Sequence, residues 1–142
     1  MNMKTAYLYF VEGSTAQSAS LPDVKAKFKR YTDMTAKTGE QLGWAYGEAA
    51  FPYVMEDRPD GNDQWFLLKG KDPKAYKYMI VGVGSKETDG KEQHYIQISV
   101  PASATDGDLC KANEYSRFLA REFKGELHLF NGRVQYFQPR KP

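Results

Sequence analysis

Apolar and polar positions alternate in several short runs of this chain and keep helical spacing in two longer ones. Alternation with a period of two residues is typical of a strand that buries one face. The runs that predict strands are Thr5–Val11, Tyr53–Glu56, Gln64–Lys69, Tyr76–Val83, His94–Val100, Glu126–Phe130 and Arg133–Phe137. Gly, Asn, Asp and Pro separate most neighbouring runs, which favours tight turns and antiparallel pairing.

Two turn signals set the expected hairpins. Pro59-Asp60-Gly61 predicts a turn because Pro presets its backbone angle and Gly accepts a positive one. Asn131-Gly132 is the strongest short-range hairpin signal in the chain, and it predicts a two-residue turn that joins the last two strands. Under that pairing Leu127, Leu129, Val134 and Tyr136 all face the core.

The first helix is predicted over Leu21–Thr38. Ser20 and Asp23 have the spacing of a capping box, in which each side chain satisfies a free backbone N–H of the first turn. Gly39 is placed to end the helix in the left-handed conformation. The inward stripe is Val24, Phe28, Tyr31 and Thr35.

The second helix is predicted over Asp106–Lys124. Thr105 and Asp108 repeat the capping-box spacing, and Gly125 follows the last apolar position. The inward stripe is Leu109, Ala112, Ser116, Leu119 and Phe123. Cys110, the one cysteine, allows no internal disulfide, and we expect it to be a small buried hydrophobe.

These elements follow the order β-α-ββββ-α-ββ. Strands and helices do not alternate singly, so a parallel sheet is not required. We therefore expect an α+β fold, mainly an antiparallel sheet, with both helices packed on one face. A chain of 142 residues with no disordered linker predicts a single domain over residues 1–142.

Composition narrows the classes of partner. Lys and Arg number 20 against 18 Asp and Glu, a bias too small to indicate a polyanionic partner. No apolar run approaches the roughly 20 residues that span a bilayer. We expect a cytoplasmic protein with no membrane partner.

The sheet face opposite the helices is the candidate site. If the apolar positions point inward, alternation sends a polar and aromatic set to the other face. That set is Tyr7, Tyr9, Tyr95, Gln97, His128, Phe130, Arg133 and Gln135. Aromatic surface of this kind generally marks a contact with another molecule. The competing interpretation is that Tyr suits strands and is tolerated half-exposed.

Other chemical signals are weak. Histidine is the side chain best suited to carry protons at physiological pH, but no carboxylate or nucleophile has a sequence relation to His94 or His128, so we assign no catalytic residue. The segment DRPDGND lacks the downstream Glu of a calcium loop, and we expect no metal there. No helix follows Gly82 and Gly84 closely enough for a phosphate loop, which favours strand glycines at a bulge or at a close backbone approach, and we expect no cofactor.

The segments TAYLYFVEGST, KTGEQLGWAYGEAAFPY and LKGKDPKAYKYMIVGVG resemble a small family of uncharacterised single-domain proteins from Gram-positive, spore-forming bacteria. The resemblance covers most of the chain. It implies a cytoplasmic bacterial protein, and it implies no activity and no catalytic residues.

Three functions follow from these patterns. The first is a non-catalytic binding or assembly domain whose aromatic face meets a second copy in a homodimer, or another protein. The second is single-stranded nucleic-acid binding, with Tyr7, Tyr9, Tyr95 and Phe130 stacking bases near Arg133; the near-neutral charge weighs against it. The third is a small-ligand pocket walled by Trp44, Tyr46 and Tyr53, although large aromatic residues are more typical of a core.

Overall fold

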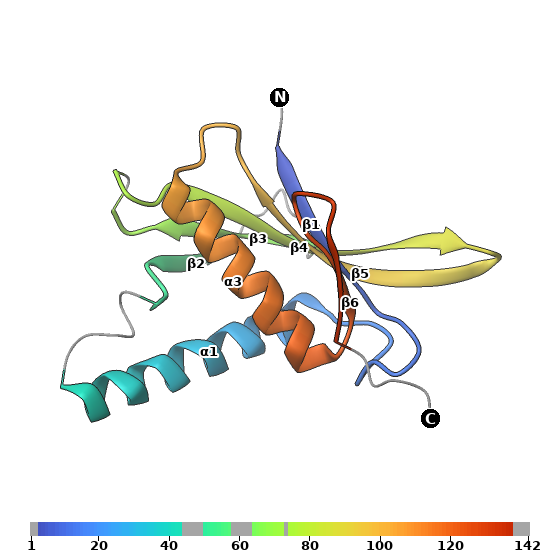
Figure 1. Ribbon diagram of the computed structural model, residues 1–142, viewed down its shortest axis with the longest axis horizontal. Coiled ribbons are helices and arrows are strands. Elements are labelled where there is room, and N and C mark those ends of the chain that lie inside the picture. Colours follow the sequence, from blue (N-terminus) through green and yellow to red (C-terminus); the bar gives the residue numbers. More distant parts are fainter. Residues whose placement is uncertain (1–2, 44–49, 58–63, 73, 138–142) are drawn as a thin grey trace.

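In the ranges of the chain that the structure describes, seven strands form one antiparallel sheet in the order β2-β3-β4-β5-β1-β6-β7, and two helices cover one of its faces (Figure 1). The computed structural model describes residues 3–43, 50–57, 64–72 and 74–137. The strands are β1 (Lys4–Tyr9), β2 (Tyr53–Asp57), β3 (Trp65–Gly70), β4 (Tyr78–Thr88), β5 (Lys91–Val100), β6 (Glu126–His128) and β7 (Val134–Tyr136). The helices are α1 (Leu21–Leu42) and α3 (Asp106–Phe123). The α+β class and the predicted order of elements are confirmed.

Both helices begin at the predicted capping boxes. The Ser20 hydroxyl accepts from the Asp23 N–H, and the Thr105 hydroxyl accepts from the Asp108 N–H. The predicted end of α1 at Gly39 is wrong, because Gly39 stays inside the helix and is buried there. The left-handed cap is Gly43, with φ of 75°, whose N–H bonds to the Gly39 carbonyl oxygen at 2.8 Å.

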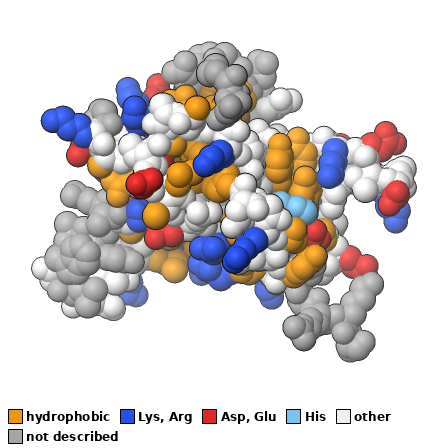
Figure 2. Space-filling model, turned by 45° about the horizontal axis from the view of Figure 1, so that its top comes forward, with side chains coloured by type: hydrophobic (Ala, Val, Ile, Leu, Met, Phe, Trp, Pro, Cys, Tyr) orange, Lys and Arg blue, Asp and Glu red, His pale blue; other side chains and the backbone are white. Residues whose placement is uncertain are grey.

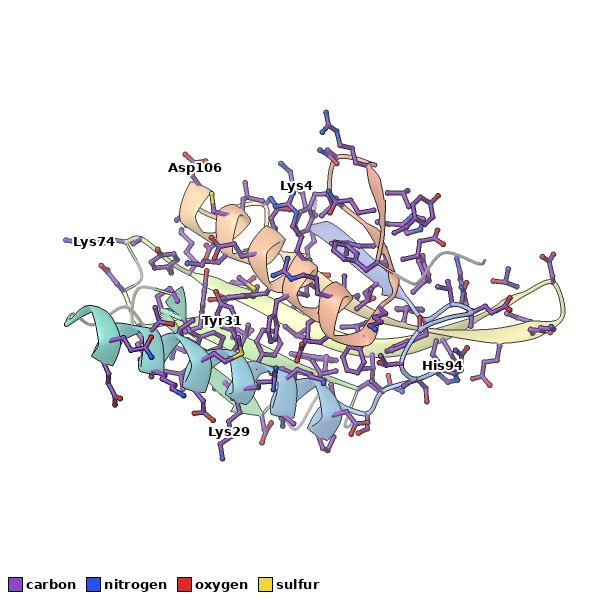
Figure 3. All side chains as sticks on the ribbon, turned by 60° about the horizontal axis from the view of Figure 1, so that its bottom comes forward. Lys4, Lys29, Tyr31, Lys74, His94 and Asp106 are labelled. Atoms are coloured by element: carbon purple, nitrogen blue, oxygen red, sulfur yellow. The ribbon has the colours of Figure 1, made fainter. Side chains whose placement is uncertain are left out.

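The core lies between the helices and the inner face of the sheet. Phe28 on α1 and Tyr115 on α3 are both fully buried, and their ring centroids are 5.6 Å apart. Tyr31 lies where the two helices meet, 5.0 Å from the Phe118 ring (Figure 3). The sheet contributes alternate residues, and the buried ones include Leu8, Phe66, Leu68, Met79, Val81, Ile96, Ile98, Val100 and Leu127. The alternation read from these runs is therefore confirmed.

Cys110 corrects one expectation. It is exposed, whereas the sequence favoured a buried position. The buried side of α3 carries Asp108, Ala112, Tyr115 and Phe118, and Cys110 lies two residues beyond Asp108, which turns it outward. In the part of the chain that the structure describes, no helix is long and apolar enough to cross a membrane.

The β4–β5 hairpin is longer than predicted and projects beyond the helices (Figure 1). Thr88 pairs with Lys91, so the loop holds only Asp89 and Gly90, with φ of 52° and 75°. Two consecutive positive φ values are typical of the type I′ turn, whose twist matches that of the strands.

The β6–β7 hairpin uses a different turn from the one predicted. His128 pairs with Val134, and the Leu129 N–H bonds to the Arg133 carbonyl oxygen at 2.8 Å. The loop thus holds three residues, and only Gly132 takes a positive φ, of 83°. This is the pattern of a type I turn followed by a left-handed glycine.

One extra loop residue shifts the register of β7 by one, and a shift of one sends every side chain to the opposite face. The prediction that Val134 and Tyr136 face the core and Gln135 faces outward is therefore wrong. Val134 and Tyr136 pair with the outward His128 and Glu126. Gln135 lies on the helix side, where the Arg117 Nε donates to its Oε1 at 3.4 Å.

Candidate contact surface

Three tyrosines and a histidine occupy the centre of the sheet face that the helices leave open. Tyr9 lies directly opposite Tyr95 of β5, and Tyr7 lies directly opposite His128 of β6. Their neighbours along each strand, such as Leu8 and Ile96, point into the core, so these four rings point away from it. We call Tyr7, Tyr9, Tyr95 and His128 the tyrosine cluster. Figure 2 shows hydrophobic side chains gathered beside a histidine.

The rings of the tyrosine cluster contact one another. Tyr7 and Tyr9 stack with centroids 5.9 Å apart, and the Tyr95 ring meets Tyr7 edge-on at 5.5 Å. The His128 ring meets Tyr9 edge-on at 4.8 Å. Offset and edge-to-face pairs are the favoured aromatic arrangements, worth about 0.5–1.5 kcal/mol each beyond area burial. The cluster is thus held in place before any partner binds.

Glycines in β4 make room for this arrangement. Gly84 lies opposite Tyr95, and a Cβ at Gly84 would come within 2.6 Å of the Tyr95 hydroxyl oxygen. A Cβ at Gly82 would come within 3.2 Å of the Trp65 Cβ. The Tyr95 ring therefore lies across the β4 backbone. The expectation of a close approach at these strand glycines is confirmed.

Charges of both signs border the tyrosine cluster. The Lys86 ammonium of β4 lies 4.3 Å from the centroid of the Tyr9 ring, within the range of a cation–π contact. On the other side, Glu126 of β6 lies opposite Tyr9, and its Oε1 is 2.9 Å from the His128 Nε2. The lysine is thus anchored on β4 and extends over the Tyr9 ring, whereas the glutamate lies on β6.

The apolar surface continues on both sides of the tyrosine cluster. Trp65 pairs with Gly82, and Leu67 pairs with Ile80, which places their half-buried side chains on the open face. At the other edge Tyr136 is 68% exposed. Sequence reasoning missed Trp65, Leu67 and Ile80, although alternation around the buried Phe66 and Leu68 was the signal that could have found them.

The eight predicted site residues do not all lie together. Tyr7, Tyr9, Tyr95, Gln97 and His128 share the central strands of the open face. Phe130 is half-buried and packs against the core cluster, and Arg133 is exposed beside the β6–β7 turn. Gln135 points to the helix side, as described above.

A buried polar cluster joins the start of α3 to β2 and to Lys77, the residue before β4. Asp108 is fully buried and accepts the Tyr53 hydroxyl at 2.5 Å and the Lys77 N–H at 3.1 Å. It also accepts the Thr105 N–H at 3.1 Å. Burial, together with the Asp108 hydrogen bond, raises the pKa of Tyr53. These groups satisfy one another inside the fold, so the cluster is structural.

The remaining candidates carry little chemistry. Tyr53 belongs to the core, while Trp44 and Tyr46 of the predicted pocket, and most of DRPDGND, lie outside the described residues. The His94 Nε2 is 3.8 Å from the Glu92 Oε1, at the edge of an open groove of about 550 Å³. Among the residues that the structure describes, no group of three or more His, Cys, Asp or Glu is placed to hold a metal ion.

Comparisons with known proteins agree with the resemblance seen in the sequence. The family model described as a domain of unknown function, DUF1885, matches residues 4–139. A crystal structure described as a protein of unknown function from Bacillus stearothermophilus is similar, with 40% sequence identity and a TM-score of 0.56. That match covers 87% of this chain and 92% of the other. Comparison with curated proteins finds no match.

Proposed function

Because the chain belongs to the DUF1885 family, whose description names no activity, we propose its function from the surface itself: a non-catalytic binding and assembly domain that acts through the tyrosine cluster. One observation carries this proposal. Tyr7, Tyr9 and Tyr95 stay half-exposed on the central strands of the face that both helices leave open.

Tyrosine is suited to this role for a physical reason. A Tyr ring gives a large apolar area but has few rotatable bonds, so ordering it in an interface costs little entropy. The contacts of Tyr9 with Tyr7, Tyr95 and His128 already restrict these rings in the free protein. A pre-ordered aromatic patch is the kind of surface on which binding energy concentrates.

Photo-crosslinking in bacterial cells that produce the protein tests this function. Gln97 lies opposite Tyr7 in the middle of the open face, and replacing it with a photoreactive phenylalanine places the probe within the surface. We expect a covalent adduct of one defined mass. The matched control is the same probe at Lys29, which is exposed on α1 and points away from the sheet (Figure 3).

The comparison of the two probes decides the result. An adduct from position 97 and none from position 29 supports a contact at the open face. If position 97 gives no adduct, or the same adducts as position 29, the proposed function is wrong. Unchanged thermal unfolding of both labelled proteins shows that the fold is intact.

A further inference from the structure

We infer that the tyrosine cluster is occupied by a second copy of this chain, packed sheet against sheet around a two-fold axis with Lys86 of each copy over Glu126 of the other. This inference rests on the proposed function, because it names the partner of the same surface. It is an interface between two open faces, and the helices of both copies lie on the outside.

Charge complementarity carries the inference. The strands around the cluster run in the order β4-β5-β1-β6, with Lys86 on the first of them and Glu126 on the last. The tyrosines lie on β5 and β1, between the two strands that carry these charged residues. Across the strands, the open face thus has a lysine anchored on β4, tyrosines on β5 and β1, and a glutamate on β6, and the Lys86 side chain extends from β4 over the Tyr9 ring.

A two-fold axis turns this order into a matched pair. When two such faces meet around an axis that lies between them and runs roughly along β5 and β1, the β4 side of one copy covers the β6 side of the other. Each Lys86 then meets a Glu126, and the symmetry makes this contact twice. A partner that carries charge of one sign, such as a nucleic acid, would be attracted by Lys86 and repelled by Glu126.

The size of the open face suits a dimer. Strands lie about 4.8 Å apart, so the five spacings from β3 to β7 span about 24 Å. Along the ten residues of β5 the face is about 34 Å long. This is on the scale of the roughly 800 Å² that a stable interface covers on each partner. Trp65, Leu67 and Tyr136 carry the apolar surface outward from the tyrosine cluster.

Charge reversal tests the inference by sedimentation equilibrium. Lys86→Glu places two negative charges against each other at both contacts, and Glu126→Lys places two positive charges there. We expect each variant to self-associate at least about tenfold more weakly than the wild type. Lys29→Glu and Glu40→Lys are the matched controls, because both positions are exposed on α1, and we expect them to change nothing.

Mixing the two variants is the decisive step. A Lys86→Glu chain and a Glu126→Lys chain have complementary charges at both contacts, so we expect the equimolar mixture to form a heterodimer with wild-type affinity. The exchange variant with both substitutions in one chain also regains both contacts and should dimerise alone. This exchange variant also lacks the Glu126–His128 contact, so its dimerisation would show that losing this contact is not what weakens the Glu126→Lys dimer.

The outcomes separate this inference from the proposed function. Weak association of each variant with recovery on mixing supports the two-fold dimer. Charge reversals without effect, or no recovery on mixing, overturn it. A crosslink from position 97 to a different molecule overturns the dimer while the proposed function stands. Salt-sensitive binding of a single-stranded oligonucleotide, lost in Lys86→Glu, assigns the surface to nucleic acid and also overturns the dimer.

Discussion

The two faces of the sheet use tyrosine in opposite ways. On the helix-covered face the Tyr115 side chain is fully buried, and its hydroxyl donates to the Ala50 carbonyl oxygen at 2.9 Å. On the open face Tyr9 is only half-buried, and its contacts are with other rings and with Lys86. The buried tyrosines on the helix-covered face therefore contribute to the free energy of folding, whereas the half-exposed tyrosines on the open face are available to a partner.

Truncating one ring on each face should give the largest contrast. Tyr115→Ala removes a ring that contacts Phe28 and Phe51, and we expect it to lower the free energy of unfolding by about 3–5 kcal/mol. Tyr95→Ala removes a half-exposed ring, and we expect a loss of about 1 kcal/mol. Urea unfolding measures both. Equal losses would show that the tyrosine cluster is as much a part of the core as Tyr115.

The two capping boxes give a second contrast. Each has an aspartate at its third helical position, but Asp108 of α3 is buried and Asp23 of α1 is exposed. Asp108→Ala leaves the N–H groups of Thr105 and Lys77 and the Tyr53 hydroxyl without their acceptor, and we expect a loss of about 3 kcal/mol. Asp23→Ala on α1 should cost only about 1 kcal/mol. Thermal unfolding compares the two variants. A loss of stability for Asp108→Ala no greater than for Asp23→Ala would contradict the stabilising role of the buried polar cluster around Asp108.

Alkaline pH should lower the free energy of unfolding through the tyrosines buried on the helix-covered face. Burial raises the pKa of Tyr53 and of Tyr115, so the unfolded chain loses these protons near pH 10 while the folded chain keeps them. The contribution of each buried tyrosine to the free energy of unfolding is fully present below about pH 10. Above that pH it falls by about 1.4 kcal/mol per pH unit for each tyrosine. Urea titrations between pH 9 and 11 measure the slope.

A matched variant sharpens this experiment. Tyr53→Phe removes one of the two buried phenols, and we expect it to reduce the alkaline slope by about half. Tyr9→Phe, on the open face, should leave that contribution in place. If Tyr53→Phe does not change the slope of unfolding free energy against pH, the Tyr53 phenol is not a group that links stability to pH.

The smallest change in stability should come from Gly84→Ala. Its Cβ would lie 2.6 Å from the Tyr95 hydroxyl oxygen, so the ring must move off β4 while the backbone stays in place. We expect a loss of less than about 1 kcal/mol, because a half-exposed ring can move aside. Tyrosine ring signals in a ¹³C NMR spectrum should shift for Tyr95, and an unmoved Tyr95 would contradict the packing described.

Most of the fold was predictable because local signals agreed with one another. Alternation placed Leu8, Ile96 and Leu127 correctly, and the capping boxes at Ser20 and Thr105 placed both helix starts. Helix ends were harder. Gly39 and Gly43 lie one turn apart, and either could have taken the left-handed cap. Only the structure shows that the helix continues to Gly43.

The errors in the site come from one turn. Asp89-Gly90 and Asn131-Gly132 are both hairpin dipeptides, yet the first forms a two-residue loop and the second belongs to a three-residue loop. The dipeptide does not reveal whether the residue before it joins the loop. That single residue moved Gln135 from the open face and put Tyr136 there. The second copy that we propose as the partner of this surface has no sequence motif, because the charge complementarity that suggests it appears only once the strand order is known.

Sedimentation equilibrium of the wild type and of Tyr9→Ser, paired with urea unfolding of both, tests most directly whether the open face holds a second copy. A dimer of twice the 16.2 kDa chain mass is expected for the wild type. Tyr9→Ser should be a monomer whose free energy of unfolding, measured where both proteins are monomeric, is lower by no more than about 2 kcal/mol. A wild-type monomer at several hundred micromolar, or a Tyr9→Ser protein as destabilised as Tyr115→Ala, would contradict the account.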